Sequence, residues 1–157
     1  MRYNRLYKDN NFLTPTTYTQ TLSEYTETLR YEDIPADVVE RAKMIMLQTV
    51  GAALAAKGTP IAEKVCRMSE EANGGEGGAT SVWGTGKKMA AVNAALALGT
   101  MSDALDWEDC SWTGHPAAGV IPCAWLAAEE KHKSGKDLIT AIVAGYEVYQ
   151  RIACAVQ

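Results

Sequence analysis

The sequence contains no long apolar run, and this absence excludes a membrane-spanning helix. Its longest apolar stretches, such as residues 50–56, fall far short of the roughly 18 to 20 residues that such a helix needs. A basic cluster is also missing, since 15 Lys and Arg stand against 19 Asp and Glu, with a formal net charge of -4. Because a phosphate backbone attracts a basic surface, we expect neither a nucleic-acid partner nor a membrane partner.

Several catalytic and redox signatures are missing as well. None of the 4 cysteines forms a CxxC pair, which a zinc or redox motif of that type requires. The nucleophile motif Gly-x-Ser-x-Gly does not occur, and residues 81–88 lack the first glycine and the final hydroxyl residue of a phosphate-binding loop. No secretory signal is recognisable, so we expect reduced thiols and a soluble, cytoplasmic protein.

The residues that are present have the composition of an ordinary globular protein. Of the 157 residues, 47% are hydrophobic and 22% are charged, which supports a single domain with one sizeable core. Residues 1–13 show no periodicity, and we interpret them as an irregular N-terminal arm. The domain itself is expected to occupy residues 14–157.

Apolar residues recur at helical spacing over most of this domain. In residues 60–73, for example, an apolar stripe at spacings of four, three and four predicts the buried face of a helix. The stripe consists of Ile61, Val65, Met68 and Ala72. Similar segments, separated by capping residues, glycines and prolines, cover residues 14–30, 34–57, 60–73, 87–104, 116–133 and 136–157. With at most one short strand pair near residues 79–86, the sequence predicts an all-α, bundle-like domain of about six helices.

The last predicted helix has no stop signal. Residues 153–157 are still apolar and periodic, without a capping glycine, a proline or a polar tail. We therefore expect the helical domain to be incomplete at its C-terminus. The alternative is a helix that frays at a natural end.

The densest group of reactive side chains lies in residues 103–116, across a predicted helix end and the loop after it. Four carboxylates, two tryptophans and His115 fall within these fourteen residues. Aromatic walls can raise a carboxylate pKa by desolvation, and histidine exchanges protons near neutral pH, which general acid–base catalysis requires. Two other interpretations stay open: solvated or capping side chains without chemistry, and a magnesium or manganese site, although the spacing matches no defined metal motif.

A series of motifs runs through the chain in a recognisable order. They are YEDIP at 31–35, LQTVG at 47–51, ALDWED at 104–109, GHPAAGVIP at 114–122, SGKDL at 134–138 and GYEV at 145–148. Together they resemble the N-terminal part of the MmgE/PrpD family, which includes 2-methylcitrate dehydratase, cis-aconitate decarboxylase and iminodisuccinate epimerase. The resemblance extends from about residue 14 to the end, and it rests on the whole series rather than on one motif.

The resemblance implies the all-helical first domain of a longer, usually homodimeric protein. Family members act on small di- or tricarboxylates by handling a proton on the carbon next to a carboxylate, without a required metal or organic cofactor. By motif position, Asp106, Cys110 and His115 fall on residues that line the site in the decarboxylase branch. The family's catalytic lysines lie further along than this chain extends. Cys110 stands where the usual residue is Thr, and Asp103 stands where many relatives have His.

From these observations we expect a lyase of the 2-methylcitrate dehydratase type. His115 would transfer the proton, Asp106 would orient or assist it, and Cys110, Asp103 and Asp109 would contact the small polycarboxylate substrate. No metal and no cofactor are expected. The alternatives within the enzyme class are an epimerase or isomerase of a dicarboxylate and a cis-aconitate decarboxylase-like enzyme.

A non-catalytic protein is the alternative from another class. The chain would then be a helical oligomerisation subunit or a split-gene fragment that needs a complementing chain. An exposed apolar stripe on the last predicted helix would favour this alternative, because such a patch needs covering. The stripe consists of Ile142, Tyr146, Tyr149 and Ala153.

Overall fold

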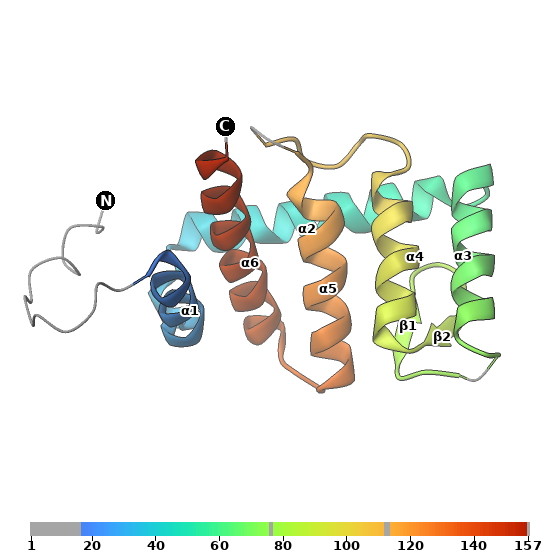
Figure 1. Cartoon of the computed structure of the whole chain (residues 1–157), viewed down its shortest axis with the longest axis horizontal. Helices are drawn as coiled ribbons and strands as arrows, with labels where there is room; N and C mark the ends of the chain where they lie inside the picture. The colour runs from blue at the N-terminus through green and yellow to red at the C-terminus, as the bar shows by residue number, and fades with distance from the viewer. Residues whose placement is uncertain (1–16, 76, 112–113, 157) are drawn as a thin grey trace, which may run out of the picture.

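The computed structural model describes residues 17–75, 77–111 and 114–156 (Figure 1). The predicted arm at residues 1–13 lies outside the described residues. Among those described, the helices are α1 Tyr18–Thr28, η1 Tyr31–Asp33 (a 3-10 turn), α2 Ala36–Ala56, α3 Pro60–Ala72, α4 Ala91–Asp103, α5 Pro116–Glu130 and α6 Gly135–Ala155. The only strands in the described ranges are β1 Thr80–Val82 and β2 Lys87–Met89. The prediction of an all-α domain with one short strand pair is confirmed.

Four helices stand side by side in the order α6, α5, α4 and α3, and the long helix α2 crosses behind this row (Figure 1). Helix α1 lies beside α6 at one end. Side chains from the row and from α2 meet in one core, in which Leu98, Ile121 and Ile142 are at most 1% exposed. The loop from α4 to α5 and the C-terminal end of α6 lie on the same side of the row, the upper side in Figure 1.

Small side chains determine which helix faces are buried. In α3 the buried residues are Ala62, Val65 and Ser69, whereas Ile61 and Met68 are about half exposed. The predicted stripe is therefore wrong in phase by about one residue. Helix α3 packs against α4, whose buried residues include two alanines, and close approach of two helices favours small side chains over large apolar ones.

The strand pair begins where expected but ends later. In β1 and β2 the pairing is antiparallel, with Thr80 opposite Met89, so residues 87–89 are a strand and not the start of a helix. Gly84 and Gly86 both have positive φ and reverse the chain between the strands. Thr80 Oγ1 then donates a 2.8 Å hydrogen bond to the Met89 carbonyl oxygen, and Met89 is buried. Helix α4 accordingly starts at Ala91.

Hydrogen-bonding side chains fix three helix starts. Thr17 and Gln20 form a reciprocal capping box at α1, and Ser134 and Asp137 form another at α6. Thr59 accepts from the backbone N–H of Ala62 at the start of α3. Helix α1 thus begins at Tyr18, later than the predicted start at residue 14.

The apolar stripe of α6 is not an exposed patch. Ile142 is 1% exposed and Ala153 is 9% exposed, while Tyr146 and Tyr149 are half-buried. On the outer side of α6, Arg151 forms a 2.6 Å ion pair with Glu147. Among the described residues, no helix combines the length and the apolar character needed to cross a membrane.

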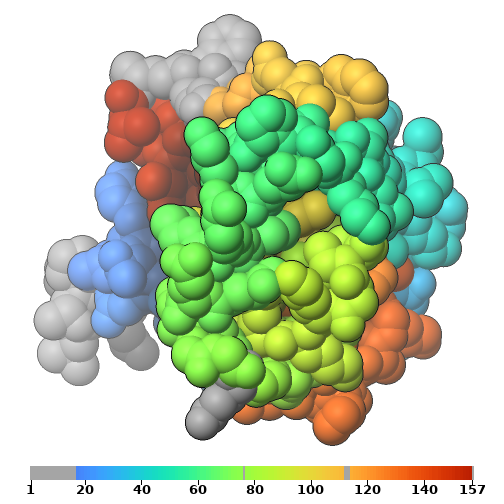
Figure 2. All heavy atoms as spheres, turned by 90° about the vertical axis from the view of Figure 1, so that its right-hand side faces the viewer, coloured from blue at the N-terminus to red at the C-terminus, as the bar shows by residue number. Residues whose placement is uncertain are grey.

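The face made by α3 and the strand pair is hollowed (Figure 2). A cavity of about 430 Å³ lies there, and its rim carries charges of both signs. Lys87 forms an ion pair with Glu70, and Lys57 Nζ donates to the Gly84 carbonyl oxygen at 2.6 Å. None of the described lining residues belongs to the 103–116 group, so this hollow is separate from the site described next.

Candidate active site

The reactive residues predicted from the sequence lie on the loop between α4 and α5. Asp103 is the last residue of α4, and His115 is the N-cap residue of α5. Asp106 adopts a left-handed backbone conformation with φ 55°, which turns the chain directly after α4. Because a helix lies on either side, the loop that carries these residues is anchored at both of its ends.

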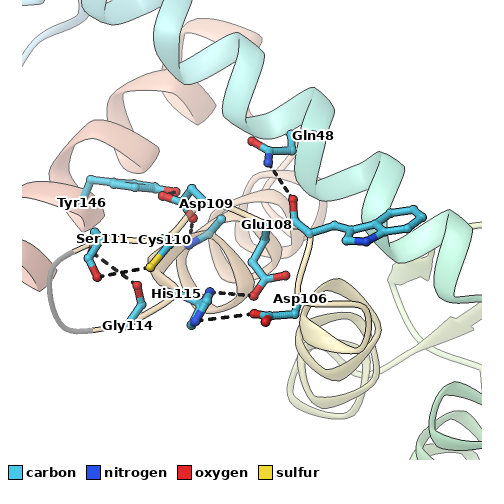
Figure 3. Close-up of polar contacts among 11 residues, drawn as sticks. Gln48, Asp106, Glu108, Asp109, Cys110, Ser111, Gly114, His115 and Tyr146 are labelled. Carbon is cyan, nitrogen blue, oxygen red and sulfur yellow. Dashed lines mark hydrogen bonds and ion pairs between the residues drawn. The ribbon is translucent and has the colours of Figure 1, made fainter.

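The His115 ring lies between two carboxylates (Figure 3). Nδ1 is 2.9 Å from Glu108 Oε1, and Nε2 is 3.7 Å from Asp106 Oδ1. The Glu108 side chain is 0% exposed, whereas that of Asp106 is 84% exposed and that of His115 is 36% exposed. One nitrogen of the ring therefore faces a buried carboxylate and the other faces an exposed one.

Glu108 is a buried acidic residue in an unusual position. Both of its carboxylate oxygens lack an aligned hydrogen bond among the described residues, so the contact with Nδ1 is an ion pair whose N–H and oxygen are out of line. Burial raises the pKa of Glu108, and the neighbouring Asp103 raises it further, while proximity to its own backbone N–H and to His115 acts in the opposite direction. This carboxyl holds its proton more tightly than an exposed glutamic acid.

The expected aromatic wall is not formed by Trp107. Its side chain is 62% exposed, and Trp112 lies outside the described residues. The backbone carbonyl oxygen of Trp107 accepts a 2.7 Å hydrogen bond from Gln48 Nε2. This bond ties the loop to α2.

Asp109 faces away from the ring and connects two helices. Its Oδ1 accepts from the backbone N–H of Ala117 at 3.0 Å, and its Oδ2 accepts from the Tyr146 hydroxyl at 2.9 Å. It therefore caps the start of α5, where the His115 side chain makes no capping bond. Burial and the Asp109 charge raise the pKa of Tyr146 far above its usual value. Both carboxylate oxygens of Asp109 thus accept hydrogen bonds within the protein. The expected contact of Asp109 with substrate stays a prediction.

Cys110 lies on the outer side of the loop. It is exposed, and its Sγ donates a weak 3.9 Å contact to the Ser111 carbonyl oxygen. Ser111 and Gly114 exchange backbone hydrogen bonds of 2.9 and 2.8 Å, which close the loop. At Gly114, with φ 155°, an added Cβ would lie 2.5 Å from the Tyr149 hydroxyl, so a larger residue would require the Tyr149 side chain to shift and would adopt a strained backbone conformation.

Asp103 completes a cluster with Glu108 and His115. One ligand atom from each lies within 4.8 Å of the other two, and two carboxylates with an imidazole suit magnesium or manganese. Asp103 is exposed, and its charge is one source of the raised Glu108 pKa. These three residues are the described group that could hold a metal ion.

The structure thus brings some predicted site residues together and separates others. Asp103 and His115 lie close to Glu108, and Asp106 lies beside the His115 ring. Glu108 is not among the predicted site residues, although it belongs to the same segment. Tyr146 was predicted only as part of an apolar stripe. Neither role has a local signal, because burial of Glu108 and contact with Tyr146 both depend on the packing of distant helices.

Comparison with known proteins gives a consistent result. The MmgE/PrpD N-terminal domain profile matches residues 20–157. The chain is 31% identical over 147 residues to a cis-aconitate decarboxylase of Aspergillus terreus, covering 88% of this chain and 29% of that protein. It is 28% identical over 146 residues to a cis-aconitate decarboxylase-like protein of Aspergillus oryzae, covering 87% of this chain and 30% of that protein.

The matched region includes α2 to α6 and the whole loop that carries His115. The chain spans about 30% of the length of the curated relatives that it matches. It belongs to the MmgE/PrpD family, through the N-terminal domain of that family.

Proposed function

We propose that the complete protein is a lyase of the 2-methylcitrate dehydratase type, which acts on small di- or tricarboxylates. The observation that carries this proposal is the position of the His115 ring between a buried and an exposed carboxylate, in a chain of this family. A partly exposed imidazole beside carboxylates is suited to taking and returning a proton near neutral pH.

In the proposed reaction, His115 Nε2 takes a proton from the carbon next to a substrate carboxylate. The electron pair of that C–H bond forms the new double bond, and the hydroxyl on the neighbouring carbon leaves. The protonated ring gives its proton to this hydroxyl, so that water departs and the ring returns to its starting state. Asp106, 3.7 Å from Nε2, stabilises the ring while it carries the extra proton.

The charge of the site sets a condition on the proposal. Asp103, Asp106 and Glu108 surround a single imidazole, so the group carries more negative than positive charge when its carboxyls are ionised. A polycarboxylate therefore needs cationic partners, which we propose come from residues beyond this chain. Asp103 and Cys110 would contact hydroxyl groups of the substrate rather than its carboxylates.

The composition of the working enzyme is part of the proposal. We propose that it needs no metal or organic cofactor, and that it works as a homodimer or with a complementing chain. Activity that persists after exhaustive chelation, in a species of twice the protomer mass, agrees with both points.

Decarboxylation is the second candidate reaction. The Aspergillus terreus relative, 31% identical to this chain, is a cis-aconitate decarboxylase. The same proton transfer at His115 then protonates the carbanion left by carbon dioxide instead of removing a proton. Epimerisation of a dicarboxylate would use the same ring to remove and return a proton at one carbon.

One assay separates these reactions. The natural gene product is isolated at its intact mass and incubated with 2-methylcitrate, cis-aconitate and an amino- or imino-dicarboxylate in deuterated buffer. Loss of water from 2-methylcitrate supports the leading proposal, and carbon dioxide from cis-aconitate supports the second. Deuterium incorporation without loss of either supports an epimerase. If no compound turns over or exchanges, the non-catalytic alternative is favoured.

That alternative has less support from the fold. It was tied to an exposed apolar stripe on α6, but Ile142 and Ala153 are buried and Tyr146 is bonded to Asp109. The stripe thus serves the interior of this chain and offers no open surface for a partner.

A further inference from the structure

The two nitrogens of the His115 ring have different surroundings. Nδ1 faces Glu108, whose side chain is 0% exposed and cannot turn away into water. Nε2 faces Asp106, whose side chain is 84% exposed and lies 3.7 Å away, beyond hydrogen-bond distance. A buried carboxylate holds its position, whereas an exposed one moves freely.

We propose that Glu108 is the positioning residue of His115: its buried carboxylate keeps the ring proton on Nδ1 and leaves Nε2 as the atom that exchanges protons. The exchange of protons at Nε2 rests on the proposed function. The placement of the ring proton on Nδ1 concerns only the protonation and orientation of one ring, and it can be tested without any substrate.

The geometry supports this assignment in a specific way. At 2.9 Å the Nδ1 and Oε1 atoms are already at hydrogen-bond distance, so alignment of the N–H with the oxygen needs a change of ring orientation and no closer approach. Catalytic hydrogen bonds are often poorly aligned in a free site and tighten when substrate binds. A carboxylate that accepts from Nδ1–H holds an imidazole in one tautomer and one orientation.

The other groups around the ring do not offer the same fixed acceptor. Asp103 is exposed at the end of α4, and Asp106 is exposed on the loop. On the α6 side, Tyr146 donates its hydroxyl proton to Asp109 and is occupied there. Glu108 is therefore the residue whose removal should release the ring.

The test is the tautomer of His115, measured by long-range nitrogen–proton NMR on the uniformly labelled protein. The chain has 2 histidines, and the exposed His132 serves as an internal reference. The pH is raised until both rings are neutral. We expect Nδ1–H at His115 and the Nε2–H form, which an exposed imidazole prefers, at His132. An Nε2–H form of His115 in the unchanged protein overturns the proposal without any variant.

Variants then identify the acceptor. Glu108→Leu keeps the bulk of the side chain but removes the acceptor, and it should shift His115 to Nε2–H. Asp106→Asn is the matched control, because it changes the carboxylate that faces the other nitrogen, and it should leave Nδ1–H in place. The His132 signals and the far-UV circular dichroism report whether each variant is folded. Persistence of Nδ1–H in a folded Glu108→Leu protein overturns the proposal.

Magnesium added to the chelator-treated protein examines the competing use of the same atoms. A cation bound through Nδ1 would occupy the lone pair there and place the ring proton on Nε2. If millimolar magnesium shifts the His115 signals in this way, the cluster is a cation site and the positioning role is wrong. Unchanged signals agree with the proposal.

Kinetics test separately whether Glu108 supports proton exchange at Nε2 during turnover. Glu108→Leu should lower kcat by about tenfold or more while KM stays within about twofold, because the ring is misoriented and the substrate contacts are kept. If the complete protein turns over no polycarboxylate, the proposed function fails while the tautomer result stands. If turnover is present and Glu108→Leu raises only KM, the positioning role fails while the function stands.

Discussion

The two ends of helix α5 carry the same kinds of residue in opposite circumstances. At the N-terminal end, His115 and Glu108 face each other across 2.9 Å, and neither forms an aligned hydrogen bond within the described residues. At the C-terminal end, Glu129 accepts from the backbone N–H of Ser81 at 2.9 Å and from its hydroxyl at 2.6 Å. Glu108 is shielded and forms no aligned hydrogen bond with the His115 ring, whereas Glu129 joins α5 to β1 through two hydrogen bonds.

The second histidine makes the contrast sharper. His132 is exposed with φ 50°, directly after the C-cap of α5. The N–H groups of His132 and Lys133 donate to the carbonyls of Glu129 and Ala128, the pattern in which a glycine commonly ends a helix. His132 thus ends helix α5 through its backbone conformation and its N–H group, and not through its ring. Surroundings, and not residue type, distinguish the two ends.

The largest expected effect is on turnover at the N-terminal end. His115→Gln in the complete protein should lower kcat by about a hundredfold or more, because it removes the proposed proton-transfer group while keeping a polar side chain of similar size. His132→Gln is the matched control and should leave kcat unchanged. Equal losses in the two variants would remove the distinction between the two ends, and unchanged turnover in His115→Gln would remove this residue from the mechanism.

The next effect is on stability at the same end. Asp109→Ala should lower the free energy of unfolding by about 2 to 3 kcal/mol, because the Ala117 N–H and the Tyr146 hydroxyl both lose their acceptor. Tyr146→Phe removes one donor and should cost about 1 kcal/mol. Urea titration of both variants and of the double variant measures the coupling. Strictly additive losses would mean that the two side chains do not act on each other.

At the opposite end, a substitution should be stabilising. His132→Gly relieves a left-handed backbone conformation that costs a non-glycine residue about 1 kcal/mol, so the free energy of unfolding should rise by about that amount. Thermal unfolding of this variant and of His132→Ala, which keeps a Cβ, gives the measurement. A decrease for alanine would show that the His132 ring itself contributes to stability, and a decrease for glycine would contradict the predicted relief of strain.

The smallest expected effect is a pH dependence that arises from Glu108. Its pKa is raised above the ordinary 4.5 in the folded chain, so the native state binds a proton there more tightly than the unfolded state does. Its contribution to stability is therefore present at low pH and is lost as the pH rises through the raised value. Relative to the unchanged protein, Glu108→Gln should become progressively more stable as the pH rises above the ordinary value of 4.5.

Other carboxyls do not obscure this measurement. Asp137, whose pKa is lowered by its capping hydrogen bonds, changes stability only near and below its ordinary 3.8, and it is present in both proteins. If the difference in unfolding free energy between Glu108→Gln and the unchanged protein does not change as the pH rises above 4.5, the unusual environment assigned to Glu108 is contradicted.

The helices could be predicted from the sequence, because their signals are local. Capping residues such as Thr59 and Ser134 act within one turn of the helix that they start. The buried faces were harder, because contact between α3 and α4 selects small residues such as Ala62 over the larger Ile61. The strand pair was predicted, but its second strand was placed too early, because its pairing depends on a turn that two glycines make possible and not on the pattern of residues 87–89 alone.

For the candidate site, the sequence could locate the segment but not the partners within it. His115 and Asp106 were predicted together and lie together, since both belong to one short loop. The burial of Glu108 could not be predicted, because acidic residues are normally exposed and no local pattern marks an exception. The bond between Asp109 and Tyr146 joins residues 37 positions apart and depends on how α6 docks.

That bond gives the site a place in the order of folding. During synthesis, α4 and the loop leave the ribosome before α6 exists, and for that interval Asp109 has no tyrosine to hold. Closing a connection of 37 residues also costs more chain entropy than the 8-residue link from Asp109 to Ala117. We therefore expect the loop to settle last among the described elements, so that a partly synthesised chain is already helical while His115 is not yet held in place.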